Sequence, residues 1–260
     1  MEYLVDKIEY NLLCVTAMDN GECAGNLNFE VDDGVLHIKY IYVDEKYRHQ
    51  GVGSGLVKVA GSYVKDNRLD GTVVSITANL EQRSILQRFL IKNNFHIPRY
   101  DGFVITADIN NISNSYLYNI PSDIDSLKGN LYKMNRLPIE LKNDFEKNIR
   151  YSIDQSYLPE NALGEIIPEL SLAVEKEGRI ASYIIFSEYE NELYLSAAYV
   201  NSNNISDLIN LLIYCFRMIK NDYDNLKIKT ANYEGYNLFK KLMMGATVTY
   251  EVVLTSYRFF

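Results

Sequence analysis

Apolar and polar residues alternate at the start of the chain in a way that predicts a small antiparallel sheet. Residues 24 to 31, for example, place Leu27, Phe29 and Val31 on one face and polar residues on the other. A tight turn at Asp32-Asp33-Gly34 then joins two strands as a hairpin. The expected strands of this meander are residues 3–8, 11–18, 23–31 and 35–43.

The pattern then changes to helices separated by single strands. Apolar residues at 56, 59, 60, 63 and 64 have the spacing of one helix face. The β-branched run at 72–78 predicts a buried strand. The expected elements are helices at 54–65 and 80–92, with strands at 72–78 and 103–107. The first half therefore has the order ββββ-α-β-α-β.

The second half repeats most of this order. Its expected strands are residues 172–175, 179–187, 192–200, 227–230 and 247–257, and its expected helices are 138–149, 203–220 and 236–244. Between the halves, a stretch rich in Asn, Ser and Pro predicts a linker or rim segment. We therefore expect domains at 1–108 and 137–260, joined by residues 109–136.

Composition limits the classes of function. The 260 residues are 47% hydrophobic and 23% charged, enough for packed cores, and the formal net charge is −8. The acidic excess is shared by both halves, so binding to nucleic acid is not expected. Three scattered cysteines, with no signal peptide and no long apolar run, favour a cytoplasmic protein without membrane or metal sites. A homo-oligomer is compatible with the sequence.

A basic, glycine-rich loop follows the strand at 35–43 and runs directly into a helix. It reads Arg48-His49-Gln50-Gly51-Val52-Gly53-Ser54. Glycines allow the main chain to approach a ligand closely, and a helix start presents free amides with a partial positive charge. The loop therefore predicts a phosphate-binding site, to which Arg48 adds a cation.

This strand, loop and helix resemble the GNAT superfamily of N-acetyltransferases, whose loop has the pattern Arg/Gln-x-x-Gly-x-Gly/Ala. The resemblance covers residues 1–108 and implies an acyl-CoA N-acyltransferase fold, an α/β (α+β) arrangement with a mixed, mainly antiparallel sheet flanked by helices. Because the second half has the same element order, the chain resembles tandem GNAT proteins with one intact and one degenerate site.

The resemblance also implies the cosubstrate and the residues that hold it. Acetyl-CoA would bind with its pyrophosphate at Arg48, His49, Gln50, Gly51, Val52, Gly53 and Ser54. Its pantetheine arm would pair with the main chain of Ile41, Tyr42 and Val43 in a V-shaped split between the strands at 35–43 and 72–78. Asn79 is a further candidate for the pantetheine, or is simply a helix cap.

Candidate catalytic groups come from the strands beside the loop. His37 occupies a position where some GNAT members carry a general base, and histidine exchanges protons near neutral pH. Glu30 is the alternative base. The family's tyrosine, which protonates the leaving thiolate, is replaced by Leu90 in the run Phe89 to Phe95. Another group or water then acts as the acid, the thiolate leaves unprotonated, or the domain binds without turnover.

The second half lacks the loop. After Val200 it reads Asn201-Ser202-Asn203-Asn204, without glycine or arginine, and Ser202 or Asn203 is expected to cap the following helix. We therefore expect an acetyl-CoA-dependent N-acetyltransferase that acts by direct attack of a small-molecule or peptide amine. The alternative is a non-catalytic acyl-CoA-binding or regulatory module. The acidic balance slightly favours a cationic acceptor.

Overall fold

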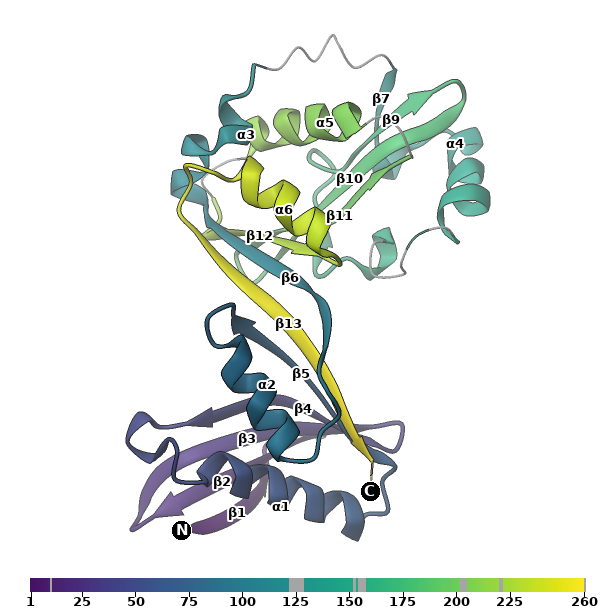
Figure 1. The fold of residues 1–260 in the computed structure, drawn as a ribbon. Coiled ribbons are helices and arrows are strands. Elements are labelled where there is room, and N and C mark those ends of the chain that lie inside the picture. The colour runs from purple at the N-terminus through teal and green to yellow at the C-terminus, as the bar shows by residue number, and fades with distance from the viewer. Residues whose placement is uncertain are drawn as a thin grey trace. The chain divides into compact units, whose positions relative to one another are not determined.

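The computed structural model describes residues 1–9, 11–121, 129–151, 153, 158–201, 205–219 and 222–259. The chain divides into two compact units (Figure 1). Unit 1 comprises Met1–Gly102 and Glu251–Phe260, and unit 2 comprises Phe103–Tyr250. Both contain mixed, mainly antiparallel sheets with flanking helices, which confirms the expected fold class.

The sheet of unit 1 has the order β1-β2-β3-β4-β5-β13. Its strands are β1 (Glu2–Lys7), β2 (Leu12–Asp19), β3 (Glu22–Asp32), β4 (Val35–Val43), β5 (Gly71–Asn79) and β13 (Val248–Phe259). Strands β4 and β5 are parallel, because a helix connects them, and the other neighbours are antiparallel. The first four strands are those predicted from the alternation.

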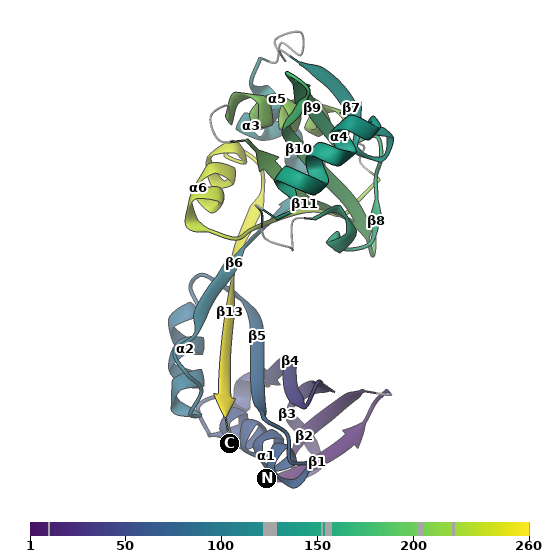
Figure 2. The same ribbon diagram turned by 90° about the vertical axis from the view of Figure 1, so that its right-hand side faces the viewer.

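Two helices, α1 (Val52–Asp66) and α2 (Arg83–Lys92), cover one face of this sheet (Figures 1 and 2). Leu56 and Val64 of α1 are fully buried against strand residues such as Leu27 and Phe29. The apolar face of α1, with its 3.6-residue spacing, thus packs on the apolar face of the sheet, where every second strand residue points inward. No described helix of unit 1 packs on the opposite face of its sheet.

The last strand of unit 1 comes from the far end of the chain. Strand β13 pairs with β5 through nine residue pairs, from Gly71–Phe259 to Asn79–Glu251. Strand β6 (Arg99–Asp108), expected to close the first half, instead pairs with β12 of unit 2 from Phe103 onward. The compact units therefore differ from the expected boundaries at 1–108 and 137–260, because the two closing strands are exchanged between them.

Unit 2 has the strand order β6-β12-β11-β10-β9-β7, with β8 beside β10. Its other strands are β7 (Asn130–Lys133), β8 (Glu165–Ile166), β9 (Leu172–Lys176), β10 (Arg179–Tyr189), β11 (Glu192–Val200) and β12 (Asn225–Thr230). Its α-helices are α3 (Tyr116–Asn119), α4 (Ile139–Asp144), α5 (Ile205–Met218) and α6 (Tyr233–Leu242). Helix α4 continues as a π-helix over Phe145–Ile149, so the two together match the helix predicted at 138–149.

The expected linker or rim segment is described at residues 109–121 and 129–136, and these parts have local structure. Ile109, Ile112 and Leu117 are buried, and β7 forms the edge of the unit 2 sheet. These parts belong to unit 2. Among the described residues, no helix is both long and apolar enough to cross a membrane.

Candidate active site

Strands β4 and β5 begin as neighbours and then separate. Their parallel pairing runs from Val35–Gly71 to Ile38–Val74 and goes no further. Beyond that point, β4 pairs with β3 alone and β5 with β13 alone. A register shift in the β3–β4 ladder falls at Lys39, where the bulge bends β4. The main chain of β4 from Lys39 to Val43 therefore presents an unpaired edge along a split.

Helix α1 begins at the open end of this split. Gly51 precedes it with a φ of +86°, a left-handed conformation that glycine adopts without strain. A Cβ at Gly51 would meet nothing within 4 Å, so space is open in front of the loop. The first intrahelical bond is Gly55 N to Gly51 O, at 2.9 Å. In the described structure, the amides of Val52, Gly53 and Ser54 find no partner, and no side chain caps the helix.

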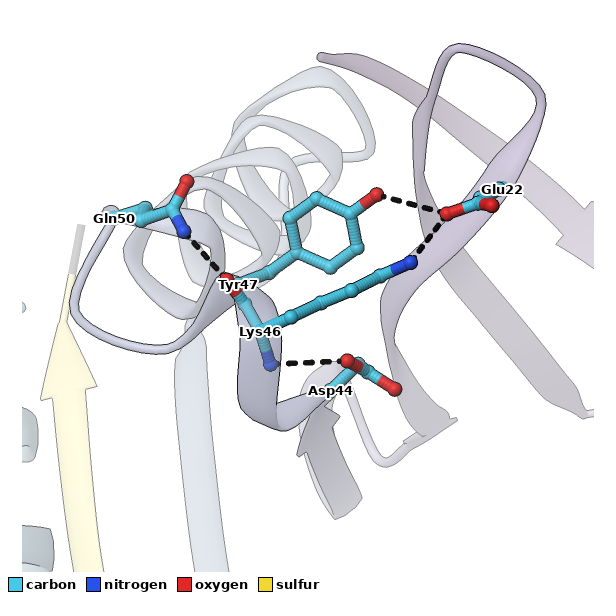
Figure 3. A network of polar contacts seen from close by, with 5 residues as sticks. All are labelled: Glu22, Asp44, Lys46, Tyr47 and Gln50. Atoms are coloured by element: carbon cyan, nitrogen blue, oxygen red, sulfur yellow. Dashed lines mark hydrogen bonds and ion pairs between the residues drawn. The ribbon is translucent and has the colours of Figure 1, made fainter.

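The loop before α1 is held by polar contacts to the start of β3 (Figure 3). Lys46 Nζ donates to Glu22, and Tyr47 OH donates to the same carboxylate at 3.3 Å. Asp44 accepts from the Lys46 amide at 3.1 Å, and Gln50 Nε2 donates to Lys46 O at 2.6 Å. Glu22 balances the positive charge of Lys46, and the contact between the two side chains holds the loop in place. We call this contact the brace.

The pKa of Glu22 is lowered, first by the hydrogen bond from Lys46 and then by its charge. A carboxylate with a lowered pKa holds its partner at neutral pH and loses it only as the pH falls through that lowered value. The brace is therefore intact throughout the neutral range, and acid is expected to release the loop.

Arg48 ties the loop back to the end of β4. Its Nε donates to Val43 O at 3.1 Å, and its Nη1 reaches Glu45 at 3.2 Å. Arg48 therefore helps to position the loop, and its expected contact with a pyrophosphate stays a prediction. His49 and Gln50 are exposed, and His49 has a φ of +62°, which shapes the turn.

Two glycines allow the close packing around β4. A Cβ at Gly53 would lie 3.1 Å from the Phe89 ring and 3.5 Å from the Val43 side chain. A Cβ at Gly25 would lie 2.5 Å from Tyr42 O, so any side chain there would displace the end of β4. Of these two glycines, Gly53 was indicated in the sequence by the Gly51-x-Gly53 spacing. Nothing local in the sequence marked Gly25, because its role depends on the neighbouring strand.

The two candidate bases are neighbours. His37 and Glu30 form a cross-strand pair, and His37 lies in the second-last residue pair before β4 and β5 separate. Both side chains are half-buried. Glu30 accepts an ion pair from Lys39 at 2.9 Å, whereas no such contact engages His37 among the described residues. His37 and Glu30 therefore both lie near the closed end of the split, and the choice of the base between them stays a prediction.

Leu90 and Asn79 occupy contrasting positions. Leu90 is 1% exposed and belongs to the core beneath the sheet, so this position supplies neither a hydroxyl nor access. Asn79 ends β5 and is exposed. It does not cap the next helix, because α2 begins at Arg83 after Gln82. The interpretation of Asn79 as a helix cap is therefore wrong, and its side chain stays available at the arm of the split.

The corresponding helix of unit 2 starts in other surroundings. Asp207 lies in the first turn of α5 with its side chain 4% exposed, and Lys176 donates to it at 2.5 Å. A buried carboxylate at this end opposes the binding of a phosphate. Ser202 and Asn203, the expected caps, lie outside the described residues. The side chain of Asp207 supports the expectation of one phosphate site, in unit 1.

Replacing Asp207 by alanine is expected to lower the free energy of unfolding of the protein by about 2 kcal/mol, because Lys176 then loses its buried partner. Urea unfolding of both proteins measures the difference. Glu146→Ala is the control, since its ion pair with Arg150 is exposed and should contribute below about 0.5 kcal/mol. Equal losses in the two variants would contradict this role for the pair.

Comparison with known proteins agrees with this geometry. Residues 2–89 match the family model described as Acetyltransferase (GNAT) family. A comparison with curated protein sequences gives no match. The matched range ends at Phe89, so it contains β1 to β5, the loop and most of α2.

Solved structures resemble the whole chain. A GCN5-related N-acetyltransferase from Sphaerobacter thermophilus is 15% identical, with a TM-score of 0.57 over 96% of this chain and 81% of its own. A tandem GNAT protein from the clavulanic acid biosynthesis pathway is 12% identical, with a TM-score of 0.58 over 94% and 82%. At these identities, the likeness is one of fold, and it includes the tandem arrangement.

Proposed function

We propose that this protein transfers an acetyl group from acetyl-CoA to an amine, because residues 2–89 match the GNAT acetyltransferase family model and the chain resembles a tandem GNAT protein in fold. The observation that carries the proposal is that two sets of backbone groups without hydrogen-bond partners border the same split. The free amides at the start of α1 lie at the open end of the split, and the unpaired edge of β4 runs along it.

The residues present suit the two polar parts of acetyl-CoA. A diphosphate requires several N–H donors and enough space to approach them. The amides of Val52, Gly53 and Ser54 are such donors, and the space in front of Gly51 is open. The amide-bearing pantetheine arm requires a strand edge, which the main chain of Ile41, Tyr42 and Val43 offers. Asn79 adds an exposed amide on the other arm of the split.

When bound, acetyl-CoA supplies an acetyl thioester, whose C–S bond breaks with the electron pair leaving on sulfur as the amine nitrogen forms the new N–C bond. His37 takes the proton from the amine, with Glu30 as the alternative base. Backbone N–H groups at the separating end of β4 orient the acetyl carbonyl. Since Leu90 offers no proton, water or a bare thiolate completes the step.

Two measurements test this proposal. Calorimetric titration with acetyl-CoA should show binding, and a panel of amines should release free CoA from the wild-type protein. The absence of acetyl-CoA binding would overturn the proposal. Binding without CoA release from a broad panel would instead favour the second candidate, a non-catalytic acyl-CoA-binding module. Buried Leu90, which stands in place of the family's tyrosine, is the observation that favours this candidate.

Arg48→Lys is expected to weaken acetyl-CoA binding about tenfold, nearly as much as Arg48→Ala, because lysine keeps the charge but loses the Nε bond to Val43 O. Calorimetry measures both. The matched control is Lys58→Ala, which removes an exposed cation from the middle of α1 and should leave affinity unchanged. Full affinity in Arg48→Lys would show that the charge matters and the positioning bond does not.

His37→Ala is expected to lower kcat about a hundredfold at neutral pH while leaving acetyl-CoA affinity unchanged, since general-base catalysis contributes this much or more. Glu30→Gln is the comparison and should have a small effect. If Glu30→Gln lowers kcat about a hundredfold and His37→Ala does not, the two roles are reversed.

A further inference from the structure

The face of the unit 1 sheet opposite α1 and α2 carries a polar and aromatic surface beside the split. Strand register places its members in three cross-strand pairs. We call this surface the acceptor face, and its pairs are Asn26–Tyr42, Asn28–Tyr40 and Glu30–His37. The candidate base therefore belongs to the same surface as the other five residues. A ligand lying along β4 on this face would have one end at His37.

Two amide side chains of the acceptor face have a carbonyl oxygen without a hydrogen bond. The Oδ1 atoms of Asn26 and Asn28 are both buried, and neither has a partner within the described part of the chain. Buried side-chain oxygens of this kind are rare in folded proteins unless a ligand or water satisfies them. Both require a donor. Since the two residues are separated by one position in β3, their side chains lie on the same face, about 7 Å apart.

The tyrosines opposite them are exposed and aligned. Tyr40 is 49% exposed and Tyr42 is 42% exposed, in the part of β4 that pairs with β3 alone. Their rings are stacked with centroids 6.5 Å apart and planes 8° apart. Exposed aromatic faces attract cations through their negative quadrupole. Lys39, which lies next to Tyr40 in β4, forms an ion pair with Glu30, so these two charges offset each other.

We propose that the acceptor face binds an aliphatic polyamine as the acetyl acceptor of this enzyme, an inference that rests on the proposed function. Ammonium groups are donors without acceptor capacity, so they complement the orphaned oxygens of Asn26 and Asn28 and the faces of Tyr40 and Tyr42. His37 and Tyr40 lie opposite Glu30 and Asn28, which are two residues apart in β3, so the bulge at Lys39 leaves the pair roughly 7 Å apart along the strands. A reacting amine at His37 and a second ammonium at Tyr40 are therefore spanned by the four-carbon segment of spermidine.

Titration with spermidine in the absence of acetyl-CoA tests the proposal separately from turnover. The wild-type protein should bind spermidine and bind hexylamine much more weakly. The double variant Tyr40→Leu, Tyr42→Leu should bind spermidine roughly tenfold less tightly, and Tyr40→Phe should retain the affinity because the ring face remains. Asn28→Asp should bind it more tightly and Asn28→Leu more weakly, an ordering that a purely structural role for Asn28 would not produce.

Acetyl-CoA titration of the same samples separates the two levels of inference. If the wild-type protein binds acetyl-CoA but not spermidine, or binds hexylamine equally well, the polyamine proposal is overturned and the acetyltransferase proposal stands. If it binds spermidine but not acetyl-CoA, the acetyltransferase proposal is overturned, and with it the role of the polyamine as acetyl acceptor, while the polyamine-binding surface stands. Loss of acetyl-CoA binding in the tyrosine double variant would reveal damage to β4, in which case the comparison between Asn28→Asp and Asn28→Leu decides.

Discussion

Replacing Gly53 by glutamate is expected to weaken acetyl-CoA binding by about a hundredfold or more, the largest effect of any single change in the loop. The new side chain would begin 3.1 Å from the Phe89 ring and so could not turn inward. It would then carry a negative charge among the three free amides at the start of α1, where the diphosphate is expected. Calorimetric titration gives the affinities.

Ser62→Glu provides the matched control for this change. It places the same charge on the same helix, at an exposed position far from the first turn. Its affinity for acetyl-CoA should equal that of the wild-type protein. Similar losses in both variants would indicate a general effect of charge on α1, and full binding by Gly53→Glu would remove the helix start from the proposed site.

Replacing Leu254 by alanine is expected to lower the stability of unit 1 by about 3 kcal/mol and to impair its acetyl-CoA binding with it. Leu254 is fully buried in β13 and pairs with Ile76 of β5, a strand that forms one arm of the split. The change lies two hundred residues along the chain from the loop it would affect. Urea unfolding followed by acetyl-CoA titration measures the two effects.

Leu226→Ala is the corresponding control in unit 2. Leu226 is equally buried, lies in β12 and pairs with Ala107 of β6. It should destabilise unit 2 by a similar amount while leaving acetyl-CoA affinity close to that of the wild-type protein. If Leu226→Ala weakened cofactor binding as strongly as Leu254→Ala, the assignment of β13 to unit 1 would have no functional meaning.

Local patterns predicted the elements because local physics produces them. The apolar spacing from Leu56 to Val64 fixed α1, the turn at Gly34 fixed the β3–β4 hairpin, and Gly51 marked the loop. The partners of β6 and β13 could not be predicted in this way. Both strands are apolar and alternating, so each satisfies either sheet equally, and the choice depends on contacts distant in sequence.

The same limit applies to the candidate site. The chemistry of the loop was visible in its glycines, whereas the direction of the Arg48 side chain depends on where the carbonyl of Val43 lies. Likewise, nothing in the sequence around Asn26, Asn28 and Tyr40 indicates a binding surface. They form one surface only because the hairpin register places them opposite and beside one another. The residue types can be read from the sequence, whereas their neighbours depend on strand pairing.

The exchange of closing strands also bears on the order of events during synthesis. A ribosome produces the loop at residues 48–54 early, but the edge of β5 away from β4 lacks its partner until residues 251–259 have been made and have left the exit tunnel. Unit 2, whose strands lie between, can fold before unit 1 is complete. The nascent unit 1 must therefore wait, with one strand edge uncovered, until the residues of unit 2 have been translated.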